Sequence, residues 1–223
     1  MATQIQSLEE LNISEILKNR PEGISSEFNF ESLANIVMNQ IYIYNGKYKY
    51  HPIEIEFYVY DKKKHADVHV YPRVAEAGKI FFHLSGMDIC FKSSIEADKD
   101  DNICFGGILI RALEREYETK TEMKARPRFG GPLTCVNEVL NSATNTIKAV
   151  VAYPNEEQKY TVTNNPKIRK GINRFEKKKD DYWDAKYRFF RNDIGDNIMI
   201  EDETFDFNLN KKIPRKRKYK IEN

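Results

Sequence analysis

Apolar residues recur at spacings of three and four in two early segments of the chain, and this spacing predicts two amphipathic helices. The first segment covers residues 8–18 and the second covers residues 30–40. From Ile41 the pattern changes to alternation, which resumes at residues 53–60 after a turn at Asn45 and Gly46. The sequence therefore predicts a β-hairpin, or two neighbouring strands, after the helices.

The two-residue period of residues 53–60 divides their side chains between the two faces of one strand. One face carries Ile53, Ile55, Phe57 and Val59, and the other carries Glu54, Glu56, Tyr58 and Tyr60. We expect the apolar face to pack against a core and the face with Glu56 and Tyr58 to border a cleft.

Further strand patterns follow along the chain. They cover residues 79–84, 89–93, 108–113, 147–153 and 159–163. Turn-like interruptions are expected at residues 96–102 and at Gly106 and Gly107. These strands predict an antiparallel or mixed sheet.

A helix is expected after Pro132, with Thr134 as its N-cap. The residues expected to point inward from it are Leu133, Val136, Val139 and Leu140. The whole pattern predicts one α+β domain over residues 1–208, followed by a basic and disordered tail at residues 209–223.

Net charge gives little direct support for nucleic-acid binding, because the 223-residue chain carries a formal charge of only +2. Positive residues are nevertheless concentrated at residues 62–64, 177–179 and 211–220, and the last run has seven Lys or Arg in ten residues. A single basic run is more often a solvated face or a tail than a binding site. The runs are therefore only supporting evidence for a nucleic-acid partner.

The three cysteines, Cys90, Cys104 and Cys135, have no metal-ligand spacing. Their odd number fits a reducing compartment better than a disulfide framework. The apolar runs are far shorter than the roughly 18 residues that span a bilayer, and residues 1–20 lack the layout of a signal peptide. We therefore expect a cytoplasmic monomer without membrane contact and without a metal or other cofactor.

Two carboxylates beside aromatic rings make the face with Glu54, Glu56 and Tyr58 the first candidate for chemistry. Aromatic crowding raises the pKa of a carboxyl group through desolvation, and such a group can act as a general base or acid near neutral pH. The alternative is a solvated face whose carboxylates pair across strands with Lys47 or Lys49, and the pattern alone favours it.

The order and spacing of these residues resemble the alkyladenine (3-methyladenine or methylpurine) DNA glycosylases. Residues 54–58 are similar to a family strand E-x-E-A-Y, and residues 108–114 reproduce V-L-I-R-A-L-E almost letter for letter. Other similar segments follow in the family order at residues 61–66, 71–73, 78–90, 131–134, 167–172 and 187–189. The resemblance extends over residues 30–190.

This resemblance implies a single mixed domain built round a curved antiparallel sheet with flanking helices, a fold similar to the C-terminal domain of formyltransferases. It also implies a hydrolase of base excision repair that flips a damaged or modified base out of DNA. By position, the water-activating carboxylate is Glu56. Tyr58 and His65 correspond to the two sides of a base sandwich, Phe82 to a second pocket aromatic, and Arg111 to the pocket arginine.

The same alignment places Arg73, Ser85, Gly86 and Met87 at the DNA. Ser85 stands where the family has a tyrosine that wedges into the duplex, and a serine cannot fill the gap left by a flipped nucleotide. Lys92 stands at a base-binding position where the family has an asparagine that excludes the amino group of guanine. We therefore expect an unusual substrate and a preference for single-stranded, mismatched or damaged sites.

Three functions are open from the sequence. The first is a monofunctional DNA glycosylase with Glu56 as general base. The second is a nucleic-acid or nucleotide-binding module that keeps the fold but has lost efficient catalysis. The third, a bifunctional enzyme with Lys92 as a Schiff-base amine, has the right residue type but no supporting spacing. Arg111 also has an alternative role, as a simple ion-pair partner of Glu54 or Glu114.

Overall fold

The computed structural model describes residues 27–62, 65–95, 103–116, 126–151, 160–164, 187–194, 205–206 and 211–212. The helix expected at residues 8–18, the turn expected at residues 96–102 and the basic run at residues 177–179 lie outside these ranges. The family-like segment at residues 167–172 also lies outside them.

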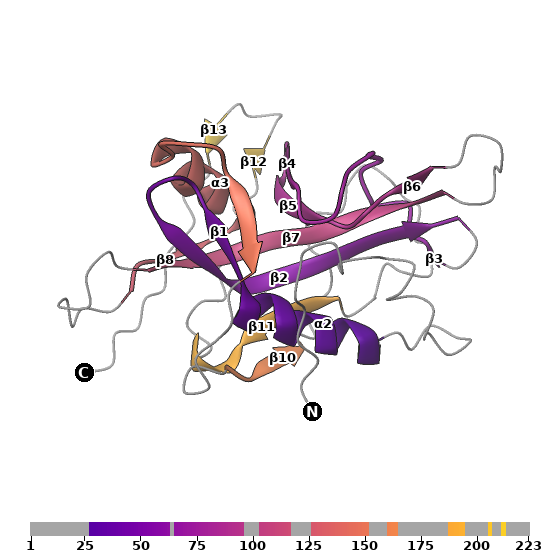
Figure 1. The fold of residues 1–223 in the computed structure, drawn as a ribbon, viewed down its shortest axis with the longest axis horizontal. Helices are drawn as coiled ribbons and strands as arrows, with labels where there is room; N and C mark the ends of the chain where they lie inside the picture. The colour runs from indigo at the N-terminus through magenta and orange to yellow at the C-terminus, as the bar shows by residue number, and fades with distance from the viewer. Residues whose placement is uncertain are drawn as a thin grey trace.

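A curled antiparallel sheet occupies the centre of the described structure (Figure 1). Its two long strands are β2 (Lys49–Asp61) and β7 (Ile103–Arg115), with the helix α2 (Glu27–Gln40) drawn below them and the helix α3 (Pro132–Asn141) above them in Figure 1. The strand order is β10 (Val162–Asn164), β11 (Arg188–Arg191), β2, β7, β5 (Gly86–Cys90) and β4 (Ile80–His83). The α+β class and the curved antiparallel sheet are confirmed for the described residues.

Short strands complete the eleven-stranded sheet at its sides. β1 (Ile41–Tyr44) and β3 (His65–Ala66) pair with β2, and β9 (Lys148–Val151) pairs with β1. β6 (Ser94–Ile95) and β8 (Arg128–Gly130) pair with β7. A separate pair is formed by β12 (Phe205–Asp206) and β13 (Lys211–Lys212), so these two lysines of the expected disordered tail lie in a strand.

The predicted hairpin at Asn45 and Gly46 is confirmed by the antiparallel pairing of β1 with β2. Oδ1 of Asn45 accepts hydrogen bonds from the backbone N–H groups of Lys47 and Tyr48, at 3.1 and 2.8 Å. Gly46 has a φ of +91°, and a Cβ there would lie 2.5 Å from Cβ of Asn145. The turn therefore requires glycine for both conformation and space.

The apolar face of β2 is buried, as the alternation predicts. Ile55 and Phe57 belong to the main core, while Ile53 packs with Ala112 in a small second cluster. The helix predicted at residues 30–40 lies within α2, whose Phe30 stacks on Phe57 with ring centroids 4.8 Å apart. Burying this apolar stripe against the sheet is what holds α2 in place.

Two strand boundaries differ from the prediction. Gly106 and Gly107 do not interrupt a strand but lie inside β7, where a Cβ at Gly106 would come within 2.2 Å of the backbone oxygen of Tyr58. Glycine here permits close approach of two strands rather than a turn. β5 begins at Gly86 instead of residue 89, because the β4–β5 turn contains only Leu84 and Ser85.

The helix α3 begins earlier than predicted, and its inward face differs. Gly131, with φ +92°, takes the N-cap position expected for Thr134, and Pro132 begins the helix, a position that suits proline. The buried residues are Cys135 and Val139. The expected inward residues Leu133 and Leu140 are 52% and 46% exposed. They lie on a different face of the helix from Cys135 and Val139.

No helix in the described part of the chain is both long enough and apolar enough to cross a membrane.

Candidate functional site

One row of directly opposed residues runs across five strands of the sheet. It contains Arg188, Glu56, Leu109, Asp88 and Phe81, in the order β11, β2, β7, β5 and β4. Opposed residues point to the same side of a sheet. Glu56 and Asp88 therefore share a face, with Leu109 between them. We call the side of the sheet that carries Glu54, Glu56, Tyr58, Asp88 and Arg111 the charged face.

Glu56 and Arg111 form a buried ion pair on the charged face. Nη1 of Arg111 donates to Oε2 of Glu56 at 2.8 Å, and the two side chains are 4% (Arg111) and 0% (Glu56) exposed. The prediction that Arg111 lies on a strand near Glu56 is confirmed. The alternative partners proposed for Arg111 are bound by other arginines, Glu54 by Arg188 and Glu114 by Arg128.

The second carboxylate of β2, Glu54, accepts a hydrogen bond from Nε of Arg188 on β11. The alternative interpretation, a solvated face whose carboxylates pair with lysines, is therefore wrong for this strand. Glu54 is only 7% exposed, and Glu56 is fully buried. Lys49 instead lies 3.9 Å from Glu116. Taking a carboxylate out of water is costly, so each of the two depends on its arginine.

Asp88 of β5 engages two basic side chains with its two oxygens. Nη1 of Arg73 donates to Oδ2, and Nε2 of His83 lies 3.1 Å from Oδ1. The guanidinium of Arg73 also lies 4.5 Å from the ring centroid of Phe81. Arg73 is only 7% exposed, so its predicted contact with DNA does not fit this structure: the guanidinium is enclosed and serves Asp88.

Tyr58 lies on the charged face opposite Gly107, and its side chain is partly exposed. A Cβ at Gly107 would lie 3.2 Å from Nη1 of Arg73 and 3.0 Å from Cβ of Asp88. The glycine thus leaves room for the Arg73–Asp88 pair beside Tyr58. This arrangement places the partly exposed Tyr58 next to buried charges.

His65 and Tyr58 are not brought together as the two sides of a sandwich. His65 is opposite Asp61 in the β2–β3 pairing, and Asp61 is an odd number of positions from Tyr58, so the two side chains point to opposite faces. The ring of His65 lies 5.6 Å from that of Tyr187, which lies 4.7 Å from that of Phe30 in α2. His65 therefore belongs to the packing on the α2 side.

Phe82 also points away from Glu56. It is opposite Met87 in the β4–β5 hairpin, and Met87 is fully buried in the main core. The two-residue turn fixes this register, so that Phe81 and His83 face the charged side instead. The fully buried side chain of Met87 is not available for the DNA contact that the resemblance implies.

The β4–β5 turn projects from the sheet at Leu84 and Ser85. Ser85 is exposed, with its hydroxyl 3.3 Å from that of Tyr71. Gly86 is buried, and a Cβ there would lie 2.8 Å from Cβ of Pro132 at the start of α3. Two of the residues expected to contact DNA therefore differ in exposure: Ser85 lies at the surface, and Gly86 is buried.

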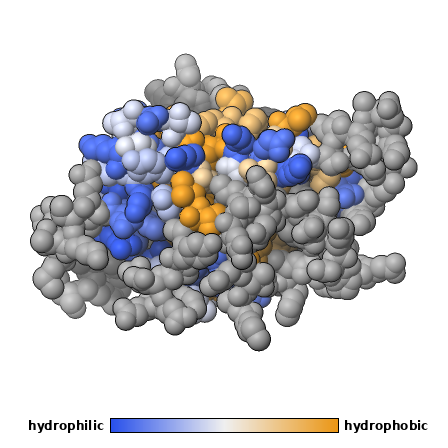
Figure 2. Space-filling view, viewed as in Figure 1, coloured by the Kyte–Doolittle hydropathy of each residue, from blue (hydrophilic) through white to orange (hydrophobic). Residues whose placement is uncertain are grey.

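Leu84 is a feature that the sequence analysis missed. It is 92% exposed at the tip of the turn, and Val74 is 80% exposed in the segment between β3 and β4. Figure 2 shows apolar surface along the upper edge of the molecule, where β4 and β5 lie in Figure 1. The available signal was an apolar residue in a tight turn, where polar residues and glycine are usual.

Lys92 lies at the surface, whereas the three cysteines are buried. Lys92 is exposed and lies beyond the end of β5. Burial raises the pKa of the Cys90 thiol, and it does the same for Cys135 in α3. Within the described ranges, no group of three or more His, Cys, Asp or Glu side chains is arranged to hold a metal ion.

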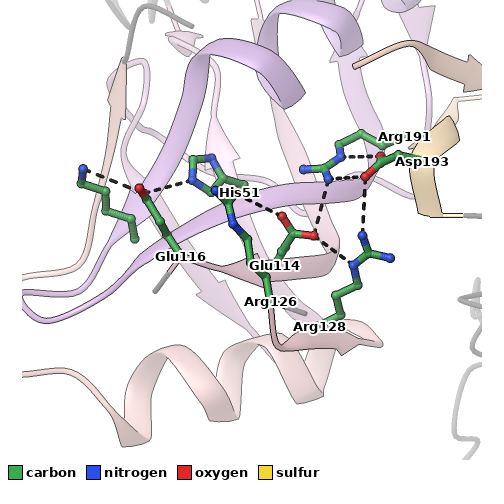
Figure 3. Close-up of polar contacts among 8 residues, drawn as sticks. His51, Glu114, Glu116, Arg126, Arg128, Arg191 and Asp193 are labelled. Atoms are coloured by element: carbon green, nitrogen blue, oxygen red, sulfur yellow. Dashed lines mark hydrogen bonds and ion pairs between the residues drawn. The ribbon is translucent and has the colours of Figure 1, made fainter. Parts of the chain in front are cut away.

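A second network of charges ties the end of β7 to β8 and to the residues that follow β11 (Figure 3). Glu114 accepts from Arg128 at 2.9 Å and from Arg191 at 3.5 Å, and Arg191 also donates to Asp193 in the short helix η3 (Asn192–Ile194) at 2.7 Å. Burial would lower the pKa of Arg191, but the hydrogen bond to Asp193 and the nearby carboxylates raise it above its ordinary value. The network fixes β11 in the sheet.

No family model, no curated protein and no solved structure matches this chain. Its function is therefore inferred from its own residues and from the geometry of the charged face.

Proposed function

We propose that this chain is a DNA glycosylase-like protein that binds a damaged or modified base on the charged face and hydrolyses its N-glycosidic bond. The observation that carries the proposal is the buried Glu56–Arg111 pair on the same face as the partly exposed ring of Tyr58. The sequence resemblance to the alkyladenine DNA glycosylases supports the same assignment, because Glu56, Tyr58 and Arg111 all fall in its most similar segments.

In the proposed reaction, Glu56 accepts a proton from a water molecule whose oxygen bonds to C1′ of the sugar. The bond between C1′ and the base breaks, its electron pair leaves with the base, and the base takes up a proton from solvent. The carboxylate also stabilises positive charge that develops on the sugar. Arg111 acts as a positioning residue for Glu56, and Tyr58 provides a ring on which the base stacks.

Leu84 supplies the apolar contact that Ser85 cannot. Apolar side chains inserted between base pairs unstack them and kink the duplex. In the proposal the exposed tip at Leu84 makes this contact, beside the Ser85 position at which the family resemblance places its wedge. The partner is DNA in which the cost of unstacking is already partly met, such as a mismatched or damaged site.

A second candidate function is a binding module on the same fold without efficient hydrolysis. Two observations favour it. Glu56 is fully buried, whereas a general base must reach a water molecule. His65 and Phe82 point away from Glu56, so that a base on the charged face is held by fewer rings than the resemblance implies.

One experiment separates the two candidates. Wild-type protein and the Glu56→Gln variant are incubated with a panel of oligonucleotides that carry alkylated, deaminated or hypermodified bases, and abasic sites are revealed by alkaline cleavage. Binding to the same panel is measured in parallel. Cleavage by the wild type alone, with binding kept by both proteins, supports the glycosylase. Binding without cleavage supports the module, and the absence of both overturns the two proposals.

A further inference from the structure

Both ring nitrogens of His83 are engaged at the base of the β4–β5 turn. Nε2 lies 3.1 Å from Oδ1 of Asp88, and the backbone N–H of Ser85 donates to Nδ1 at 3.2 Å. A backbone N–H can only donate, so Nδ1 must be an unprotonated acceptor and Nε2 must carry the proton. The geometry therefore selects the neutral imidazole with its proton on Nε2.

The surroundings of His83 allow this neutral form. Asp88 of β5 is shared with Arg73, which binds its other oxygen, so the carboxylate already has a positive partner. The remaining groups around the ring are aromatic, with the centroid of Tyr71 at 5.0 Å and that of Phe81 at 5.8 Å. Asp88, Arg73 and Tyr71 are thus the titratable or charged groups of the described residues that face the ring.

We propose that His83 is a pH-sensitive latch of the β4–β5 turn. The neutral ring accepts the hydrogen bond of Ser85 and holds the turn that presents Leu84. A proton added to Nδ1 makes this atom a donor that faces the Ser85 N–H, a second donor, at 3.2 Å. The hydrogen bond is then lost. The turn is held while the ring is neutral and released when the ring is protonated.

The effect of the latch on DNA binding rests on the proposed function, whereas the hydrogen bond of the turn does not. The same turn carries Leu84, so its release regulates the contact that we assign to the tip. Protonation of the His83 ring weakens binding to mismatched duplex, since a loosened tip must be ordered again on binding. The hydrogen bond between the His83 ring and Ser85 is a property of the chain without DNA.

The test is nuclear magnetic resonance of the full chain without DNA. The ring nitrogen shifts of His83 report its tautomer and its titration, and hydrogen exchange reports protection of the Ser85 amide relative to the intrinsic rate at each pH. We expect the Nε2–H tautomer at high pH. Protection of Ser85 should then fall about tenfold through the titration of His83, the size expected for the loss of one hydrogen bond.

Two variants give matched controls. His83→Asn keeps an oxygen acceptor near the position of Nδ1 but does not titrate, so protection of Ser85 should stay constant with pH. His83→Gln keeps a donor directed at Asp88 but has no acceptor near Ser85, so protection should be low at every pH. The wild-type ring shifts remain decisive where a variant does not fold.

Constant protection of Ser85 through the titration of His83, or the Nδ1–H tautomer at high pH, would overturn the latch. Neither result bears on DNA binding. Conversely, a latch that titrates as expected in a chain that binds no oligonucleotide would refute the proposed function and leave the latch in place.

Discussion

Nη1 of Arg111 and Oε2 of Glu56 lie 2.8 Å apart inside the sheet, and this ion pair joins β7 to β2 where neither side chain is more than 4% exposed. Removing Arg111 leaves the buried charge of Glu56 without this ion pair. Arg111→Met is therefore expected to lower the free energy of unfolding by about 3–5 kcal/mol. The double variant Glu56→Gln/Arg111→Met, which leaves no such charge, should recover most of this loss. Urea denaturation measures both, and wild-type stability of Arg111→Met would contradict the pair's role.

Gly86→Ala tests the contact between the β4–β5 hairpin and α3. The new Cβ would lie 2.8 Å from Cβ of Pro132 and 2.9 Å from Cδ1 of Leu109. We expect a loss of about 1–3 kcal/mol in the free energy of unfolding, because the helix or the turn must shift. The neighbouring variant Ser85→Ala is the control and should change stability by less than about 0.5 kcal/mol. Equal effects of the two would show that the close contact does not exist.

Leu84→Ser tests the tip of the turn. Leu84 is 92% exposed, so stability should not change. Affinity for mismatched duplex should fall severalfold, while affinity for single strands should change little because no unstacking is needed there. Leu140→Ser, at a residue 46% exposed on α3, provides a control and should leave the affinity for both kinds of DNA unchanged. A uniform loss for both kinds of DNA would argue against insertion by Leu84.

His51 makes the stability of the fold depend on pH. Burial lowers the pKa of His51 below its ordinary value, although the hydrogen bond with Glu116 acts in the opposite direction. The unfolded chain then takes up a proton at higher pH than the folded chain, so stability falls as the pH drops below about 6.5 toward the folded pKa. In the His51→Gln variant this decrease in stability with falling pH should disappear. Urea midpoints of the two proteins over this range provide the measurement, and parallel curves would refute the assignment.

The cysteines should be unreactive in the folded protein. Cys90 and Cys135 are fully buried, and burial raises the pKa of both thiols, so little thiolate is available for reaction. Cys104 is 6% exposed. We expect no labelling of Cys90 or Cys135 by a thiol reagent under native conditions, and complete labelling in denaturant. Rapid native labelling of either residue, located by peptide mass spectrometry, would contradict the described packing.

Local patterns in the sequence predicted the parts of the fold that depend on neighbouring residues. The alternation at residues 53–60 and the Asn45–Gly46 turn predicted the hairpin, because period and turn chemistry act over a few residues. The similar segments around Glu56 and Arg111 predicted that these residues meet, although they are 55 positions apart. This long-range contact was predicted from the resemblance, because the alternation of apolar and polar residues gives no information about distant partners.

The rest of the site depended on registers and partners that local patterns do not encode. A two-residue turn places Phe81, rather than Phe82, on the charged face, and a shift of one residue reverses every side chain. The burial of Glu54 requires Arg188, which is 134 positions away in the chain. Neither the turn length nor this distant partner could be inferred from the spacing of carboxylates and rings on one strand.

The most direct test of the account is the release of free base in single-turnover reactions, measured by mass spectrometry. Wild-type protein and Glu56→Gln are each mixed in excess with mismatched and single-stranded oligonucleotides that carry an alkylated purine or a deaminated base. The account predicts release by the wild type, at least about 100-fold slower release by Glu56→Gln, and similar binding by both. Equal release by the two proteins, or a wild type that neither releases a base nor binds these oligonucleotides, would contradict it.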